Sequence, residues 1–497
     1  MRRAGRIDRR IVLSVVLGLI GTACTIQGPR IVLEGQGGGE GVPGVVQTGA
    51  GDPGQGTVVG GTKVGGGSVG GGGGGGGPIV ADDSCKGKAT DVGVTGNSIK
   101  LGSTFAISGP VSNISGPILK GVQAYLNEIN ATGGVHGRKV EFKFYDDGWD
   151  AQRGKSKIKQ LVEQDKVFML VSVPSSNGLD AATGYLDQKK VPVLGTSGLI
   201  ETQFKAHMQW PVGTSTRSAA RIGLIDATQR LQAKTFAIVW LDLLAGYEAR
   251  EAIFEAAKRG FQGLNEKSIV ADRRISISEP SFESVWNDVQ NQARKNGVAD
   301  GRPDQIVLAI DPTNAIKAMQ AAERLGFRPK KGWGGAAPLF LDLVLRDAPY
   351  AVKTGMTAGT AFFPPVGQFA NQPAVKKYVQ VVRKYFADVD LNNPYLQGGY
   401  TGAALAIDVL EKVGSCVTRE RVIQAANSLT NHAPAGLTNP LTFRPLGEGP
   451  GHYGNTYGLV VQAVPKGTAG CTRSIGCWNV IPASSSDPFY KDPTPGR

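Results

Sequence analysis

The stretch of sequence that decides the fold is residues 99–147, IKLGSTFAISGPVSNISGPILKGVQAYLNEINATGGVHGRKVEFKFYDD. Its first seven residues are mostly apolar or small, which predicts a short strand. Residues 116–130 predict a helix, because Ile118, Val122 and Leu126 recur at helical spacing. Residues 140–145 predict a second strand. Strand, helix and strand in this order indicate a right-handed unit with two parallel strands.

The same alternation continues along the chain and later restarts. Further strands are expected at residues 167–173, 191–194, 235–241 and 305–310, and helices at 151–164, 175–188, 245–259 and 313–325. Residues 167–173 are almost continuously apolar, as in a parallel strand covered on both faces. The chain after residue 78 is too long for one hydrophobic core. We therefore expect an α/β protein with two doubly wound parallel-sheet lobes.

Residues 1–23 have the features of a secretory signal peptide. Arginines precede the apolar run at residues 11–20, and small residues follow at 21–23. Cys24 comes next, which resembles the lipobox of bacterial lipoproteins, although Gly21 stands where that pattern usually has leucine. The sequence predicts lipidation of Cys24, with simple cleavage nearby as the alternative. Residues 24–78 are rich in glycine and predict a flexible tether.

Composition excludes several classes of protein. The 497 residues include 54 Lys+Arg against 41 Asp+Glu, for a formal net charge of +13. These basic residues are dispersed and not interleaved with aromatic residues, so we expect a solvated surface and no nucleic-acid binding. No apolar run reaches the about 18–20 residues that a membrane-spanning helix needs. The expected location is the outer face of the cell membrane, where a lipid anchor would hold an exported body.

The remaining cysteines agree with export. Cys85, Cys416, Cys471 and Cys477 form an even set, which predicts two disulfides with three possible pairings. Cys471 and Cys477 could close a small loop, and Cys85 with Cys416 would tie the N-terminal segment to a distant helix. Zinc is the competing interpretation, but no histidine has ligand spacing to the Cys471–Cys477 pair. We expect no metal.

Four blocks of sequence resemble the substrate-binding proteins of branched-chain amino acid ABC importers. They occur in order, at residues 105–110 (FAISGP), 121–130, 133–140 (GGVHGRKV) and 145–147 (YDD). The resemblance covers residues 98 to roughly 465. It implies the type I periplasmic binding protein fold, in which a three-segment hinge joins the lobes and a small ligand binds between them.

The resemblance also implies an organisation and a function. The expected hinge segments lie near residues 211–214, 361–365 and 441–444. Lobe 1 would comprise residues 79–212 and 364–443, and lobe 2 residues 213–363 and 444–470, with a C-terminal tail at 471–497. The protein would capture a small polar solute, such as an amino acid, amide or small carboxylate, and deliver it to ABC permease subunits. A ligand-sensing receptor of the same fold is the alternative.

Candidate ligand-binding residues in the first lobe follow the ends of its strands. Ser108 lies in a loop expected to face the cleft. Ser175 and Ser176 lie where a strand passes into a helix, and a serine there either caps the helix or holds an anionic ligand with the helix amides. The resemblance favours ligand contact for Ser175 and for the loop that contains Thr196 and Ser197.

The second lobe fits the amino acid binders less well. Tyr247 lies one position from the family's tyrosine and could instead cap its helix. Asp311 follows a strand at another contact position, with a helix N-cap as the alternative. The carboxylate that pairs with a ligand ammonium should fall near Gly335, where the sequence has none, and the aromatic lid position falls at Ile114. The ligand could therefore be something other than an amino acid.

Enzymatic chemistry has little support in the sequence. The histidines are widely scattered, and neither a zinc-protease motif nor a nucleophile elbow occurs. Asp146 and Asp147 are adjacent on an extended segment, so they point to opposite faces and cannot flank one bond. We expect a binding protein without catalytic residues or a cofactor.

Overall fold

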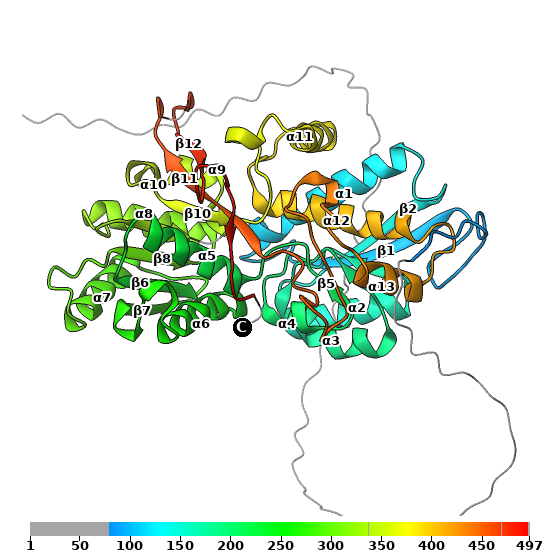
Figure 1. Ribbon diagram of the computed structural model, residues 1–497, viewed down its shortest axis with the longest axis horizontal. Helices are drawn as coiled ribbons and strands as arrows, with labels where there is room; N and C mark the ends of the chain where they lie inside the picture. Colours follow the sequence, from blue (N-terminus) through cyan, green and yellow to red (C-terminus); the bar gives the residue numbers. More distant parts are fainter. Residues whose placement is uncertain (1–78, 336, 469, 496–497) are drawn as a thin grey trace, which may run out of the picture. The chain divides into compact units, whose positions relative to one another are not determined.

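The first lobe is built on a parallel sheet. The computed structural model describes residues 79–335, 337–468 and 470–495, and Figure 1 shows the first lobe beside the green elements of the second. Within these residues the strands pair in the order β2-β1-β3-β4-β5, and every pair is parallel. The strands are β1 (Ser98–Phe105), β2 (Lys139–Asp146), β3 (Met169–Val171), β4 (Val193–Leu194) and β5 (Gln209–Trp210).

Helices cover both faces of this sheet. One face packs against α1 (Ser112–Ala131) and α12 (Pro394–Lys412), and the other against α2 (Ala151–Glu163) and α3 (Ser176–Lys189). Neighbouring residues of β3 divide between the two: Leu170 packs with α2 and α3, whereas Met169 and Val171 pack with α1 and α12. This alternation follows from the period of two in a strand and explains the continuous apolar run. The lobe also contains α4 (Glu201–Lys205), α11 (Pro373–Tyr385) and α13 (Arg419–Asn427).

The second lobe has a larger, mixed sheet, in the order β12-β11-β10-β9-β8-β6-β7. The pairs from β7 to β10 are parallel, whereas β11 is antiparallel to β10, to β12 and to β13. Its strands are β6 (Phe236–Leu241), β7 (Ile269–Ile275), β8 (Gln305–Ala309), β9 (Gly332–Gly335), β10 (Thr357–Thr360), β11 (Tyr457–Val464), β12 (Cys477–Ile481) and β13 (Tyr490–Lys491). The prediction of two doubly wound lobes is confirmed, with an antiparallel side that the sequence did not indicate.

The faces of the second sheet are also both covered. Phe236, Ile238 and Trp240 of β6 pack against α5 (Thr216–Gln229) and α6 (Leu244–Lys258). The intervening residues of β6 pack against α7 (Phe282–Lys295) and α8 (Pro312–Arg324). The short helices of this lobe are α9 (Asp342–Asp347), α10 (Pro349–Lys353), η1 (Phe261–Gly263), η2 (Glu266–Ser268) and η3 (Ala337–Leu339). Of the remaining two, η4 (Gly367–Phe369) contacts β12, and η5 (Pro434–Gly436) contacts α11 and α12 of the first lobe.

The chain passes between the two sheets three times. The first passage joins β5 to α5, the second follows β10, and the third precedes β11. Phe443 still belongs to the core of the first lobe, so the third passage follows it. Two strands, β12 and β13, lie in residues 471–497, for which we expected a tail. They bond to β11 and so extend the second lobe.

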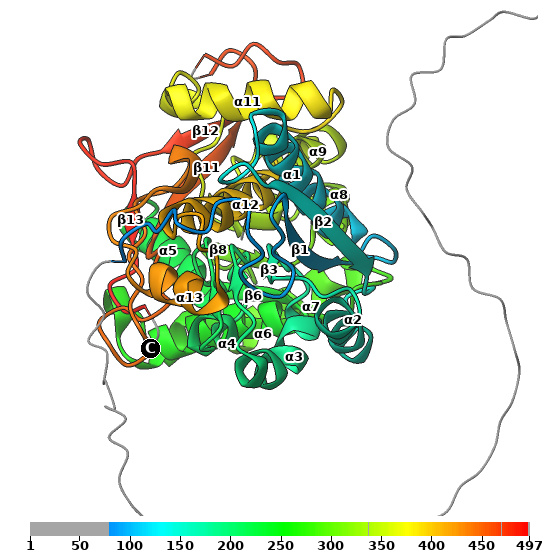
Figure 2. The same cartoon turned by 90° about the vertical axis from the view of Figure 1, so that its right-hand side faces the viewer.

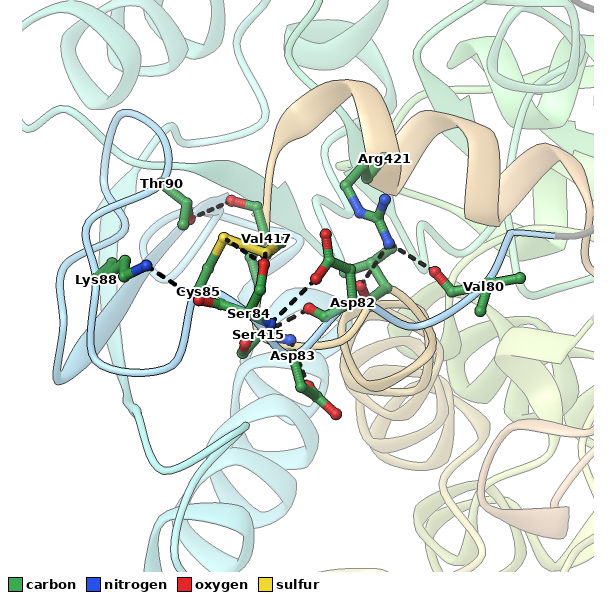
Figure 3. Close-up of a disulfide and its surroundings, with 12 residues drawn as sticks. Val80, Asp82, Asp83, Ser84, Cys85, Lys88, Thr90, Ser415, Val417 and Arg421 are labelled. Carbon is green, nitrogen blue, oxygen red and sulfur yellow. Dashed lines mark hydrogen bonds between the residues drawn. A yellow bond between two sulfur atoms is a disulfide. The ribbon is translucent and has the colours of Figure 1, made fainter.

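Two disulfides connect the four described cysteines, as the even count predicted. Cys471 pairs with Cys477, and Cys85 pairs with Cys416 in the turn between α12 and α13. Figure 3 shows the Cys85–Cys416 disulfide, which fastens the segment before β1 to the first lobe. A hydrogen bond from the Arg421 guanidinium to the carbonyl of Val80 (2.7 Å) holds the same segment. The turned view in Figure 2 shows this segment, in blue, beside α12.

The expected signal peptide, Cys24 and the tether at residues 24–78 lie outside the described residues. Within the described part of the chain, none of the helices is long and apolar enough to cross a membrane.

Candidate functional site

A cavity lies between the two lobes, where their strands end. It offers about 150 Å³ to the centres of water-sized molecules, which is room for on the order of ten of them. Its wall comes from α1 and α3 in the first lobe, from the ends of β6 and β8 and the start of α6 in the second, and from two of the passages between lobes. Ligands of open α/β sheets bind at the carboxyl ends of strands, so this cavity is the candidate site.

Three of the residues predicted from the sequence line this cavity. Ser176 is the first residue of α3, and Ser197 follows β4. Asp311 follows β8 and caps α8: its Oδ1 accepts hydrogen bonds from the amides of Thr313 (3.0 Å) and Asn314 (3.1 Å). The alternative reading of Asp311 as an N-cap is therefore confirmed, and the same side chain also borders the cavity.

Ser175 and Thr196 lie below the cavity wall instead of in it. Both side chains are fully buried. The Ser175 hydroxyl caps α3 by accepting a hydrogen bond from the amide of Gly178 (3.3 Å), which confirms the N-cap reading. Next to it, burial raises the pKa of Asp147 above its usual range, although a hydrogen bond from the amide of Trp149 (2.9 Å) lowers it. Ligand contact by Ser175 or Thr196 stays a prediction.

Ser108 and Tyr247 also lie outside the cavity wall. The Ser108 hydroxyl donates to the carboxylate of Asp146 at the end of β2. Tyr247 is 49% exposed and its ring meets Trp240 edge-on at 6.3 Å. It does not cap its helix, because Leu243 precedes α6. The neighbouring Gly246 stands where the family has its tyrosine, and it lines the cavity. Backbone therefore takes the place of the aromatic side chain at this position.

Several lining residues are aromatic and were not identified from the sequence. They are Trp149, Phe362 and Tyr395. Trp149 has a left-handed backbone (φ 63°), which is unusual for a bulky residue and points to a local constraint. Phe362 lies in the expected second passage, and Tyr395 is the second residue of α12, after Asn393, whose side chain caps that helix. Of these three residues, Tyr395 had a sequence signal: Asn393 before it is a typical N-cap and indicates the start of a helix.

The cavity wall is mostly apolar and carries little charge. Asp311 is the only charged residue among the described lining residues, and no lysine, arginine or histidine joins it there. The other polar groups of the wall are the indole N–H of Trp149, which has no hydrogen-bond partner among the described residues, and the hydroxyls of Ser176, Ser197, Thr214, Thr216 and Tyr395. Burial raises the pKa of Tyr395 well above its usual range, and the negative charge of Asp311 adds to this. The wall therefore offers apolar contact, hydroxyl groups, one indole donor and one acceptor carboxylate.

A carboxyl group links the two lobes on one side of the cavity. Both oxygens of Glu248, on α6, accept a hydrogen bond from the amide of Glu201, the first residue of α4 (3.0 Å each). Tyr453, from the third passage, donates to Glu201. Burial raises the pKa of Glu248 to about 7; the charge of Glu201 also raises it, whereas Arg217 and Lys205 lower it.

A reciprocal contact joins the lobes elsewhere. Asp390, between α11 and α12, accepts a hydrogen bond from the amide of Asp342, the first residue of α9 (2.9 Å). The Asp342 carboxylate accepts from Asn392 (3.0 Å) and pairs with Arg473 (2.8 Å). Burial, followed by the charge of Asp342, raises the pKa of Asp390 to about 6. Each lobe thus supplies one carboxyl that caps a short helix of the other.

The described residues offer no group of side chains able to hold a metal ion. The described cavity wall also contains no histidine, cysteine or lysine that could act as a nucleophile or a base near neutral pH.

The comparisons with known proteins agree with this geometry. A family model described as periplasmic binding protein matches residues 98–467. The Leu/Ile/Val-binding protein homolog 7 of Brucella abortus is 24% identical over 327 residues, which is 63% of this chain and 77% of that protein. The Leu/Ile/Val-binding protein homolog 3 of Brucella melitensis is 32% identical over 87 residues, which is 16% of this chain and 24% of that protein.

Two solved structures share the fold at low sequence identity. The fatty acid ABC transporter substrate-binding protein from Thermomonospora curvata is 19% identical with a TM-score of 0.64, over 81% of this chain and 95% of that chain. The ABC transporter solute-binding protein from Rhodopseudomonas palustris, in complex with 3,4-dihydroxy benzoic acid, is 16% identical with a TM-score of 0.63, over 80% and 98%. Since the family model matches more than half of the chain, this protein belongs to the periplasmic binding protein family.

Proposed function

We propose that the protein captures a small, mostly apolar solute between its lobes and delivers it to an ABC importer. The observation that carries the proposal is the cavity wall, to which both lobes and two of the passages between them contribute. A solute that contacts both lobes favours the closed arrangement by its difference in affinity for the closed and open states. A permease could then distinguish the loaded protein by its shape.

The lining narrows the solute class that the sequence suggested. An anionic solute would place its charge in a low-polarity cavity beside Asp311 without a lining cation, which is costly. A hydroxyl, amide or ammonium group can instead donate to that carboxylate. One structural neighbour is a fatty acid transporter substrate-binding protein and another is in complex with 3,4-dihydroxy benzoic acid; both compounds combine an apolar or aromatic body with a carboxyl group. We therefore favour an apolar body with a donor group at the end near Asp311.

The test compares four molecules that share one branched apolar body: leucine, leucinamide, isocaproate and isohexanol. We expect leucinamide and isohexanol to raise the melting temperature of the full chain more than isocaproate does, because a bound ligand stabilises by mass action. Stabilisation by isocaproate alone would overturn the proposed solute class. Asp311→Asn, which keeps the helix cap, should remove any preference for ammonium, and the exposed Asp388→Asn serves as control.

Closure and delivery need separate measurements. Small-angle scattering with a stabilising solute should show a smaller radius of gyration than without it. An unchanged radius at saturation would contradict closure. Uptake of the same labelled solute by cells should depend on this protein and on a permease; uptake that is unaffected by deletion of the protein would contradict delivery. None of the contacts in the described residues favours the receptor alternative.

We further propose that acylation of Cys24 anchors the protein to the membrane. The support is the small-residue segment before Cys24, after a short apolar run. Two or more acyl chains hold a protein stably at a membrane, whereas one binds only marginally. Cys24→Ala should release the protein into the soluble fraction, and a variant that stays with membranes in high salt would contradict the anchor.

A further inference from the structure

A second cavity lies inside the second lobe, between α5 and the sheet. Its walls are α5 on one side and β8, β9 and β10 on the other. It offers about 50 Å³ to the centres of water-sized molecules, which is room for about four of them. Protein interiors contain few voids of this size, so the residues that leave it open need an explanation.

Small residues on both walls create this void. The α5 wall carries Ala219, Ala220 and Gly223, and the sheet wall carries Gly359 among others. A methyl group added to Gly223 would meet no atom within 4 Å. The opposite face of the same sheet differs, because Trp286 and Trp333 fill it. Glycine within a helix costs stability, so an open wall at Gly223 is not the packing that stability alone favours.

The second cavity meets the cavity between the lobes. Both are bordered by Thr216, Ala219, Ala249 and Ala309. From this shared border the second cavity follows β8 along alternate residues, from Ala309 through Val307 to Gln305. Four residues of strand correspond to about 13 Å. The void is therefore a narrow channel that extends from the border of the cleft along β8 to the start of this strand.

A polar side chain lies at the far end of this channel without a partner. Gln305 is 2% exposed and lines the channel, beside Gly334. None of the side-chain hydrogen bonds among the described residues involves its amide, and the polar atoms of this amide are open to the channel instead of being enclosed by protein. An amide can both donate and accept. This pairing of a mostly apolar channel with an amide that can bond to a guest points to an occupant.

We propose that the cleft and the channel form one continuous site for an elongated, uncharged molecule, whose apolar chain lies under α5 and whose far end carries a hydroxyl or carbonyl that bonds to Gln305. This inference rests on the proposed function and extends it by assigning length and a second polar end to the solute. The small side chains at the shared border of the two cavities leave room for an unbranched apolar chain. Inside the channel, this chain would contact apolar walls instead of water.

The test uses straight-chain alcohols from butanol to dodecanol, with binding measured by calorimetry on the full chain. Affinity should rise about three- to fourfold for each added methylene that enters the channel. Gly223→Leu should fill the channel, reduce the affinity for dodecanol at least about tenfold and leave butanol unaffected. Gly359→Val narrows the channel from the opposite wall and should act in the same direction.

A matched control and a polar variant separate the channel from general effects. Gly184 on α3 is likewise an exposed helical glycine with no atom near an added methyl group, but it lines neither cavity, so Gly184→Leu should leave both affinities unchanged. An α,ω-diol whose second hydroxyl reaches Gln305 should bind more tightly than an alcohol of equal length. Gln305→Leu should remove that difference.

Each outcome decides a different question. A rise of affinity with length that Gly223→Leu abolishes and Gly184→Leu preserves supports the channel. Binding of butanol without any gain for longer alcohols, or an unchanged dodecanol affinity in Gly223→Leu, overturns the channel and leaves the proposed function in place. If neither the alcohols nor the branched probes bind, the proposed function and this inference both fail.

Discussion

The carboxyl of Glu248 should make the stability of the protein depend on pH. This group accepts two hydrogen bonds from the backbone of the other lobe, and burial raises its pKa from 4.5 to about 7. A carboxyl whose pKa is raised on folding binds its proton more tightly in the folded state. The free energy of unfolding is then undiminished below pH 4.5 and falls as the pH rises toward 7, where the folded state acquires a buried charge.

The size of the effect follows from the shift. A rise from 4.5 to about 7, at about 1.4 kcal/mol per unit, sets an upper limit of about 3.5 kcal/mol. Glu248 is only half-buried, and solvent screens part of the interaction, so we expect about 1–2 kcal/mol. The variant Glu248→Gln keeps an oxygen that can accept from the Glu201 amide but carries no charge at any pH.

The assay is chemical denaturation of both proteins at several pH values. Glu248→Gln should match the natural protein near pH 4.5 and exceed its free energy of unfolding by about 1–2 kcal/mol at about pH 8. Glu251→Gln removes a carboxylate from the same helix without touching α4, and should follow the natural protein. Parallel curves for the natural protein and Glu248→Gln would refute the assignment of this buried charge.

Three further predictions follow from described contacts. Ser175→Ala should lower the free energy of unfolding by about 1 kcal/mol through loss of the α3 cap, and calorimetry with a bound probe would show whether affinity changes as well. Replacing both Cys85 and Cys416 with serine should cost about 2–4 kcal/mol in denaturation experiments, because their disulfide closes a long loop. Burial and the charge of Asp342 raise the pKa of Asp390 to about 6, so Asp390→Asn should increase the free energy of unfolding over that of the natural protein more at about pH 7 than at about pH 4. The same difference between variant and natural protein at both pH values would contradict the contact with α9.

The elements that the sequence predicted well are those with a local apolar pattern. The expected strand at residues 99–105 became Ser98–Phe105, and the one at 140–145 became Lys139–Asp146. Strand β9 has the sequence Gly-Trp-Gly-Gly, which carries no strand pattern and is held by its neighbours β8 and β10. Strands β12 and β13 likewise depend on pairing with β11. Pairing between distant segments leaves little trace in a local pattern, and for this reason these strands could not be predicted.

The candidate site was located more easily than its side chains. The strand ends indicated where Ser175, Ser176 and Asp311 would lie, because the ends of parallel strands meet at one edge. Ser175 and Ser176 are adjacent, yet the first turns inward to cap α3 and the second borders the cavity. Which of two neighbours faces a ligand depends on the rotation of the helix about its axis. That rotation is set by packing against the sheet, which the sequence pattern does not specify.

The net charge of the chain also gives no guide to the charge of its solute. The formal charge of +13 indicates a basic protein, yet Asp311 borders the cavity and the carboxyls of Glu248 and Asp390 lie at the boundary between the lobes. A basic side chain does reach this boundary, but Arg473 is paired with Asp342 there. Long-range attraction by a basic surface would raise the local concentration of anions outside the protein. The one charged residue of the described cavity wall, Asp311, is negative, so binding inside the cavity disfavours the anions that the surface attracts. The measurement is the affinity for a neutral and for an anionic probe at rising salt concentration. An increase in the affinity for the neutral probe relative to that for the anionic probe would show that these two effects act separately.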